Sequence, residues 1–181
     1  TPRRPERFDE VAKVLDRSGL KWERRSQLET TTRDPAARIL LIDVVGELGA
    51  WWGTATIAYV GGSLSRRGGQ NMIEPAAYGS AVCFGPNTWN FKDVVQLLLH
   101  SEAAHVVQNG AELQTFLRRC LSEPQFAHAL GKRAQELVIA QQGAADRTLV
   151  FLQGLAASTI NRTIPTPAVA KQPKPPRRQA G

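Results

Sequence analysis

The chain has 181 residues, of which 42% are hydrophobic and 22% charged, and it carries a formal net charge of +7. This length fits one domain with a substantial core, and the apolar content is ordinary for a globular protein. No apolar run approaches the roughly 20 residues that cross a bilayer, which argues against a membrane-spanning segment within this sequence.

The predicted secondary structure alternates short strands with helices. In residues 5–18 the apolar side chains recur at helical spacing, and residues 38–43 form a near-continuous apolar run, typical of a parallel strand buried on both faces. Taken along the chain, we expect a helix at 5–18, strands at 20–25 and 38–43, a helix at 47–54, a strand at 56–60, a helix at 71–78, a strand at 81–84, a helix at 91–99, a strand at 104–107, and helices at 111–120, 124–142 and 144–157. This alternation predicts an α/β fold with a doubly wound, Rossmann-like parallel sheet.

The positive charge is concentrated at the end of the sequence. Residues 158–181 hold five basic residues, five prolines and no acid, so the rest of the chain is close to neutral. Such a composition predicts a disordered tail. It either keeps the chain in solution or attracts anionic lipid or nucleic acid weakly, and no specific nucleic-acid partner is expected.

A glycine-rich segment follows the apolar run at 56–60. It begins at Gly61 and Gly62 and leads into a helical segment that opens on Asn71, with Glu74 in its first turn. A strand, a flexible loop and a helix N-terminus in this order let backbone N–H groups and the helix dipole meet an anion. Glycines also let a ligand approach the backbone closely, although they equally serve tight turns. The segment is neither the dinucleotide fingerprint GxGxxG nor a P-loop.

Two further segments with ligand-type chemistry fall at the ends of predicted strands. Arg3 stands where a strand upstream of Thr1 would end, and residues 45–47 follow the strand that ends near Asp43. Ligands of open α/β sheets bind where the loops at the carboxyl ends of the strands converge. Together with the glycine-rich loop, these segments predict a three-sided site for a phosphorylated molecule.

Cysteine and histidine give no sign of a metal or cofactor site. Cys83 and Cys120 stand far apart without a CxxC pattern, and the three histidines are scattered. We expect reduced thiols, with Cys83 packed in a strand. No cofactor and no metal are predicted.

Five motifs carry a resemblance to a known family. Residues 2–8 (PRRPERF), 43–48 (DVVGEL), 59–64 (YVGGSL), 68–77 (GGQNMIEPAA) and 84–91 (FGPNTWNF) are similar to the motifs PRHPERF, DTMGEL, FVGGSL, GGHNPLEPAA and FGPHTFNF. They occur in the same order and at compatible spacing over residues 1–155. The chain resembles the C-terminal domain of the bacterial 3-deoxy-D-manno-octulosonic acid (Kdo) transferases, which adopt the glycosyltransferase-B fold.

The resemblance implies that this domain binds the donor CMP-Kdo through its cytidine monophosphate part. By match to the motifs, the contacts come from Pro2, Arg3, Val45, Gly46, Glu47, Asn71, Met72, Ile73 and Glu74. Arg3 suits the phosphate, and Glu74 suits the sugar hydroxyls, since a free carboxylate near a phosphate is repulsive. Arg4 and Gln70 stand where the family usually has His.

The resemblance also implies an activity of a larger protein. The intact parent would be an inverting glycosyltransferase of lipopolysaccharide biosynthesis that transfers Kdo to a lipid A precursor at the cytoplasmic face of the bacterial inner membrane. Its catalytic base and acceptor site belong to an N-terminal domain that is absent here, so no catalytic residue is expected in this chain. Residues 1–157 would form the donor-binding domain, without its first strand.

Other interpretations stay open at this point. Another glycosyltransferase-B member or a sugar-nucleotide epimerase shares the sheet and the phosphate site, and a non-catalytic remnant would keep only the fold. Outside the motifs, Trp51 and Trp52 fit core or interdomain packing better than a base-stacking platform. Arg66 and Arg67 are either solvated or contact an acidic group of the ligand.

Overall fold

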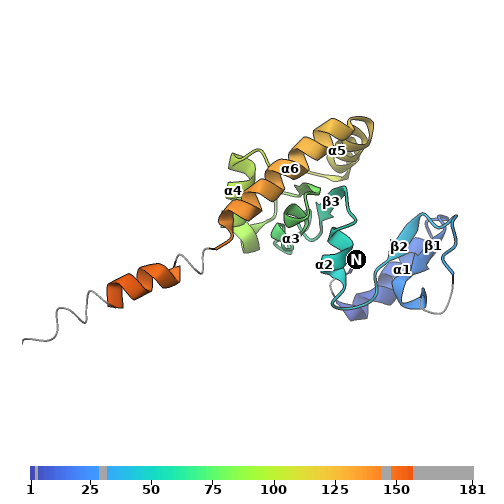
Figure 1. Cartoon of the computed structure of the whole chain (residues 1–181). Coiled ribbons are helices and arrows are strands. Elements are labelled where there is room, and N and C mark those ends of the chain that lie inside the picture. Colours follow the sequence, from blue (N-terminus) through green and yellow to red (C-terminus); the bar gives the residue numbers. More distant parts are fainter. Residues whose placement is uncertain (3, 29–31, 144–147, 157–181) are drawn as a thin grey trace, which may run out of the picture. The chain divides into compact units, whose positions relative to one another are not determined.

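The computed structural model describes residues 1–2, 4–28, 32–143 and 148–156, and the chain divides into two compact units, 1–140 and 141–181 (Figure 1). In the second unit, residues 148–156 are helical, in agreement with the helix predicted at 144–157. Leu149, Val150, Phe151, Leu152 and Leu155 of that helix are exposed. The predicted tail, 158–181, lies outside the described residues, as does the predicted domain boundary at 157.

In the first unit, the predicted helices and strands are present in the predicted order, together with short 3-10 helices that were not predicted. They are η1 (Pro5–Arg7), α1 (Phe8–Asp16), β1 (Trp22–Arg24), η2 (Arg25–Gln27), β2 (Ile39–Leu41), α2 (Leu48–Trp52), β3 (Ile57–Val60), α3 (Ile73–Ala77), β4 (Ala81–Phe84), η3 (Trp89–Phe91), α4 (Lys92–His100), β5 (His105–Val106), α5 (Gly110–Ser122) and α6 (Pro124–Gln141). The helix predicted at 5–18 is divided into η1 and α1, and α2 and α3 are shorter than predicted. α2 ends against Gly53, and α3 begins after Asn71 because the Asn71 side chain accepts the Ile73 N–H at 3.0 Å.

All of the described strand pairs are parallel, as predicted. β3, β4 and β5 form one sheet in that order, and β1 pairs with β2 in a second sheet. The parallel α/β architecture is therefore confirmed, but the described strands do not join into one continuous sheet. Among them, none pairs with the second edge of β1 or of β3.

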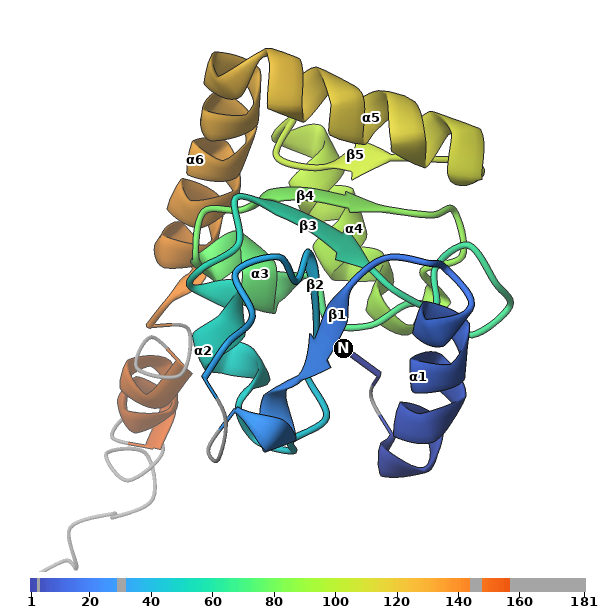
Figure 2. The ribbon, with the colours of Figure 1, turned by 90° about the vertical axis from the view of Figure 1, so that its right-hand side faces the viewer.

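The core is centred on β4, whose four residues are fully buried. Side chains alternate between the two faces of a strand. Val82 and Phe84 pack in one cluster with α3 and α4, whereas Ala81 and Cys83 pack in another with α5 and α6 (Figure 2). Helices therefore cover both faces of this sheet, as a doubly wound fold requires. α1 buries less than its spacing predicts, since only Ala12 is buried and Val14 is 53% exposed.

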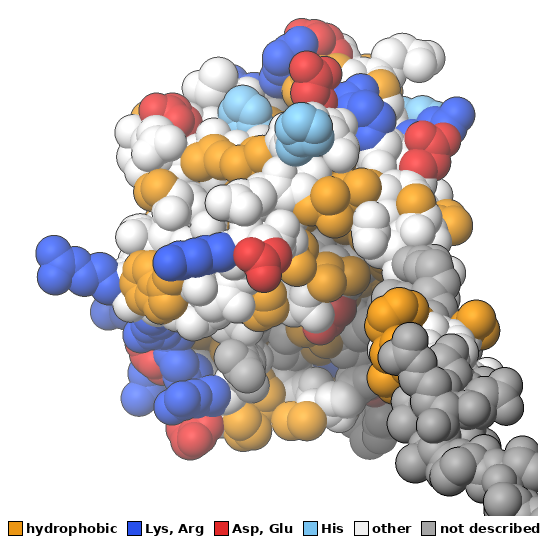
Figure 3. Space-filling view, turned by 90° about the vertical axis from the view of Figure 1, so that its left-hand side faces the viewer, with side chains coloured by type: hydrophobic (Ala, Val, Ile, Leu, Met, Phe, Trp, Pro, Cys, Tyr) orange, Lys and Arg blue, Asp and Glu red, His pale blue; other side chains and the backbone are white. Residues whose placement is uncertain are grey.

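The surface carries apolar side chains in separate groups. Figure 3 shows a face on which hydrophobic side chains lie between polar and charged ones. Scattered apolar residues of this kind are normal on the surface of a globular domain. Within the described part of the chain, no helix is long and apolar enough to cross a membrane.

We expect Gly131→Ala to destabilise the domain. A Cβ atom at Gly131 in α6 would overlap the carbonyl oxygen of Gly79 and lie 2.8 Å from its carbonyl carbon. The helix would have to move away from the turn before β4, at a cost of about 1–3 kcal/mol, although Ala otherwise favours a helix interior by about 1 kcal/mol. Urea unfolding of both proteins measures the difference. The control Gly49→Ala, where a Cβ meets nothing within 4 Å, should be neutral or stabilising; equal stability of Gly131→Ala and the wild type would contradict the close packing.

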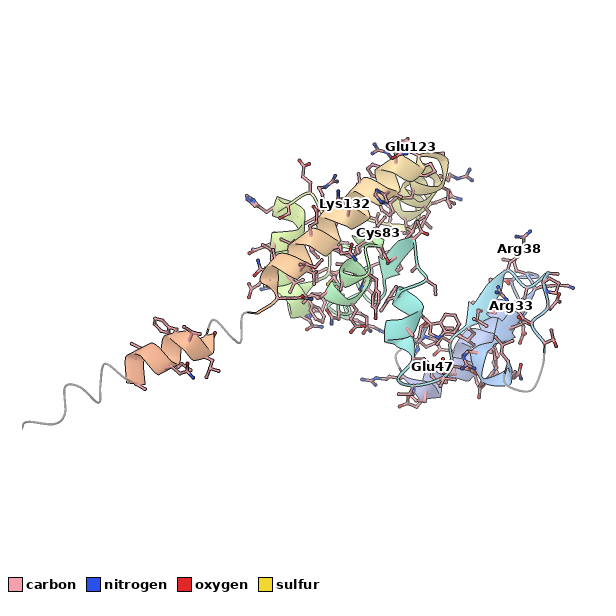
Figure 4. All side chains as sticks on the ribbon, in the orientation of Figure 1. Arg33, Arg38, Glu47, Cys83, Glu123 and Lys132 are labelled. Atoms are coloured by element: carbon pink, nitrogen blue, oxygen red, sulfur yellow. The ribbon has the colours of Figure 1, made fainter. Side chains whose placement is uncertain are left out.

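We expect the thiol of Cys83 to be unreactive in the folded chain. Burial raises the pKa of Cys83, which is labelled in Figure 4, to about 12 from its ordinary value of 9.0, and burial also raises the pKa of Cys120. Because the unfolded state releases these protons first as the pH rises, folding stability should fall with pH above about 9. A disulfide reagent at pH 8 should label both thiols rapidly in urea and only slowly without it. Rapid native labelling in Cys120→Ala, where Cys83 is the remaining thiol, would show that β4 is accessible.

Candidate functional site

The candidate site is built from segments that follow the carboxyl ends of β1, β2 and β3. Arg25 and Ser26 come directly after β1, residues 43–47 come after β2, and residues 61–74 come after β3. β1 and β2 are parallel and end at the same edge of their sheet, and ligands of such folds bind beyond the carboxyl ends of the strands. Side-chain contacts among these segments bring them together.

An ion pair joins the segment after β1 to the start of α2. Arg25 donates from Nε and Nη2 to the two carboxylate oxygens of Glu47, each at 2.9 Å. The Glu47 carboxylate is 30% exposed and also accepts the indole N–H of Trp51 at 3.2 Å. Figure 4 shows Glu47 at the turn that leads into α2. A forked arginine–carboxylate contact of this kind fixes both groups and neutralises the carboxylate.

The next tryptophan of α2 binds the second candidate glutamate. Trp52 donates its indole N–H to Oε2 of Glu74 at 3.2 Å, and Asn71 donates its side-chain amide to Oε1 at 3.0 Å. Neighbouring residues of a helix point about 100° apart. The two tryptophans therefore reach two different loops, and α2 connects Glu47 with Glu74.

Asp43 ties the segment after β2 to the segment after β1. Its carboxylate, 4% exposed, accepts the N–H and the hydroxyl of Ser26 at 2.9 and 2.7 Å and lies 3.6 Å from Arg24. Burial alone would raise the pKa of this carboxyl, but the hydrogen bonds from Ser26 and the charge of Arg24 outweigh it and hold the pKa below its ordinary value. Asp43 therefore acts as a charged structural anchor.

Ser63 holds the glycine-rich loop against the segment after β4. Its buried hydroxyl donates to the carbonyl of Val60 at 2.6 Å and accepts the N–H of Gly85 at 2.8 Å. Its carbonyl accepts the backbone N–H of Asn87 at 2.9 Å. The loop is therefore a well-anchored turn.

The glycines of this loop serve the protein's own packing. Gly62, Gly68 and Gly69 have positive φ angles, which L side chains rarely adopt. A Cβ atom at Gly68 would meet Trp89 and Asn90, whereas at Gly61 it would meet nothing within 4 Å. Of these glycines, only Gly61 leaves open space beside the backbone.

Among the described residues, no group of three or more His, Cys, Asp or Glu side chains could hold a metal ion. The polar network is instead made of carboxylates bound by arginine, amide and indole donors. Such an arrangement can bind hydroxyl groups and anions through hydrogen bonds.

Comparison with known proteins identifies the family. No protein-family model matches the chain. It is 38% identical over 152 residues to 3-deoxy-D-manno-octulosonic acid transferase of Bordetella pertussis and 33% identical over 153 residues to that of Haemophilus influenzae; each alignment covers 84% of this chain and 35% of the relative. The crystal structure of the C-terminal CMP-Kdo binding domain of WaaA from Acinetobacter baumannii matches with a TM-score of 0.71 and 30% identity, over 76% of this chain and 71% of that one.

The chain belongs to the Kdo transferase family. It spans about a third of the length of the curated relatives it matches. The resemblance inferred from the sequence motifs is thus confirmed, and so is the fold class, because the structure is similar to the C-terminal domain of a family member.

The candidate site residues that match the Kdo transferase motifs differ in how exposed they are to solvent. Val45 is 74% exposed, Gly46 is exposed with a φ angle of 95°, and Ile73 is 39% exposed. Pro2 is half-buried, and Arg3 lies outside the described residues.

Met72 stands apart because its side chain is fully buried in the core. Any ligand contact of Met72 would therefore come from its backbone. The ligand contacts predicted for the motif residues stay predictions.

Three of the residues that donate hydrogen bonds to Glu47 or Glu74 were not identified as site residues from the sequence. They are Arg25, Trp51 and Trp52. Arg25 had one available signal, because it ends a predicted strand at the same edge as the other loops. Trp51 stands four residues after Glu47, at helical spacing, whereas Trp52 had no signal, since it is 22 positions from Glu74.

We expect Asp43→Asn to destabilise the domain in a pH-dependent way. A folded-state pKa below the ordinary value contributes stability that is present at neutral pH and is lost as the pH falls through that folded value. At pH 7 the variant should lose about 1–3 kcal/mol of unfolding free energy, and the difference should shrink toward pH 3. Urea titrations across this range test it, with Glu136→Gln as a control because its ion pair with Lys132 is exposed. A pH-independent loss would exclude the charge as the cause.

Proposed function

We propose that this chain is the donor-binding domain of a Kdo transferase and that it binds CMP-Kdo through the CMP part. The observation that carries the proposal is the similarity to the CMP-Kdo binding domain of WaaA, at 30% identity and a TM-score of 0.71. The binding residues are those predicted from the motifs: Pro2, Arg3, Val45, Gly46, Glu47, Asn71, Met72, Ile73 and Glu74.

The charge arrangement supports an anionic ligand beside Glu47. Because Arg25 neutralises this carboxylate, Glu47 does not repel a nearby phosphate as a free carboxylate would. Arg3 would supply the net positive charge for the phosphate. The Ile73 N–H is already bound by Asn71, so α3 offers the phosphate fewer free donors than a longer helix would.

Glu74 suits the sugar part of the nucleotide. Each of its carboxylate oxygens accepts one hydrogen bond from the protein, and each has capacity for another. Ribose hydroxyl groups are neutral donors that match this capacity. Gln70 and Arg4, which replace the usual His, would adjust how the phosphate or the Kdo carboxylate is held.

The activity belongs to a larger protein. The parent would be an inverting transferase that moves Kdo from CMP-Kdo to a lipid A precursor in lipopolysaccharide biosynthesis, at the cytoplasmic face of the bacterial inner membrane. A carboxylate in a separate N-terminal domain would deprotonate the acceptor hydroxyl, and Arg3 would stabilise the leaving phosphate. In this scheme residues 1–157 bind the donor and carry out no chemistry alone. The edges of β1 and β3 that no described strand pairs with would accept the first strand of the domain.

Titration calorimetry with CMP, UDP and GDP tests the donor. The wild-type chain should prefer CMP. A preference for UDP would indicate another sugar-nucleotide enzyme of the same fold. No binding by a well-folded sample would favour a non-catalytic remnant.

We expect Arg3→Ala to weaken CMP binding by about 1.5–3 kcal/mol, the range for hydrogen bonds to charged groups. The same calorimetric titration measures it. Arg38→Ala is the matched control, because Arg38 is exposed and stands before β2, at the end away from the site (Figure 4). An unchanged affinity of Arg3→Ala would remove Arg3 from the site.

A further inference from the structure

We infer that Trp52 is a positioning residue for nucleotide binding: its indole N–H holds the Glu74 carboxylate in the orientation that accepts hydrogen bonds from the ribose hydroxyls. The inference rests on the proposed binding of CMP. It adds a residue outside the motif positions and a stated selectivity, for ribonucleotides over 2′-deoxyribonucleotides.

The Glu74 carboxylate is oriented from both sides. Trp52 donates to Oε2 and Asn71 donates to Oε1. Asn71 is itself fixed, because its side-chain oxygen accepts the Ile73 N–H at 3.0 Å. A carboxylate held by two fixed donors does not lose rotational freedom when a ligand binds, so more of the contact energy appears as affinity.

Trp52 is anchored well enough to act as a fixed donor. Its ring is partly buried and packs against the core cluster that contains Met72, Ala76 and Phe84. The orientation of its N–H group is therefore set by core packing and not by the ligand. The core of the domain thereby sets the direction of a side chain at the site.

The remaining acceptor capacity of Glu74 fits two neighbouring hydroxyl groups. With one protein hydrogen bond on each oxygen, one further lone pair on each is available, and the two oxygens of a carboxylate match the spacing of a vicinal diol. In CMP the ribose supplies such a pair, whereas 2′-deoxy-CMP has only one hydroxyl of the pair. A site that hydrogen-bonds a hydroxyl group discriminates against the ligand that lacks it.

Trp52→Phe separates positioning from packing, because phenylalanine keeps an aromatic ring and lacks the N–H donor. We expect CMP affinity to fall by roughly five- to tenfold, because the Glu74 side chain must then be immobilised when the ligand binds. The affinity for 2′-deoxy-CMP should change less, so the preference for CMP should diminish. Trp22→Phe, which removes an indole donor to Asp16 before the candidate site begins, should leave both affinities unchanged.

The indole N–H resonances provide a test that does not depend on ligand. In a nitrogen–proton NMR spectrum of the full chain, Glu74→Gln should shift the Trp52 indole signal, because its charged acceptor is lost. The Trp22 indole, which donates to Asp16 at 3.1 Å, should keep its position. An unmoved Trp52 signal would overturn the inference even if Trp52→Phe failed to fold.

The binding outcomes distinguish this inference from the proposed function. If the wild-type chain prefers CMP to 2′-deoxy-CMP and Trp52→Phe keeps that preference, the inference fails and the proposed function stands. Equal wild-type affinity for the two nucleotides also overturns the inference alone. If the wild-type chain binds no CMP, both the inference and the proposed function fail.

Discussion

The candidate site depends on the ion pair between Arg25 and Glu47. No backbone pairing connects the β1-β2 sheet to the β3-β4-β5 sheet among the described strands, so side-chain contacts and the chain between them must do so. Arg25 fixes Glu47 at the start of α2, and Trp52 at the end of α2 binds Glu74 beside α3. Removing Arg25 would leave a half-buried carboxylate with a single indole donor, which is costly for a charged group. The geometry of two loops therefore depends on one arginine.

Much of the fold could be predicted from the sequence, because the local patterns and the tertiary structure agree. Residues 81–84 form a strand with the predicted bounds, since a short apolar run has no stable place except a buried strand between helices. The ends of α2 and α3 were predicted less well. They depend on Gly53 and on the Asn71 side chain, whose local contacts override the apolar pattern.

The site was predicted in part. The motifs identified Glu47 and Glu74, but not their contacts with Arg25 and Trp52, because each of these partners stands 22 residues away in the sequence and only the folded chain brings them together. The glycines illustrate the opposite difficulty. Their number pointed to a close ligand, whereas the space beside Gly68 is filled by Trp89 and Asn90. A glycine pattern records that something lies close to the backbone, and that neighbour can belong to the protein itself.

The shortness of α2 links folding to recognition. A helix of five residues is too short to persist by itself in water, because its nucleation cost is not repaid within so few hydrogen bonds. It exists because the contacts at both of its ends and the core beneath Trp52 hold it in place. A ligand that touches Glu47 and Glu74 together would bridge those ends, and its binding energy would add directly to the stability of the folded chain. The folding stability of the domain would then increase with the fraction of sites that hold ligand.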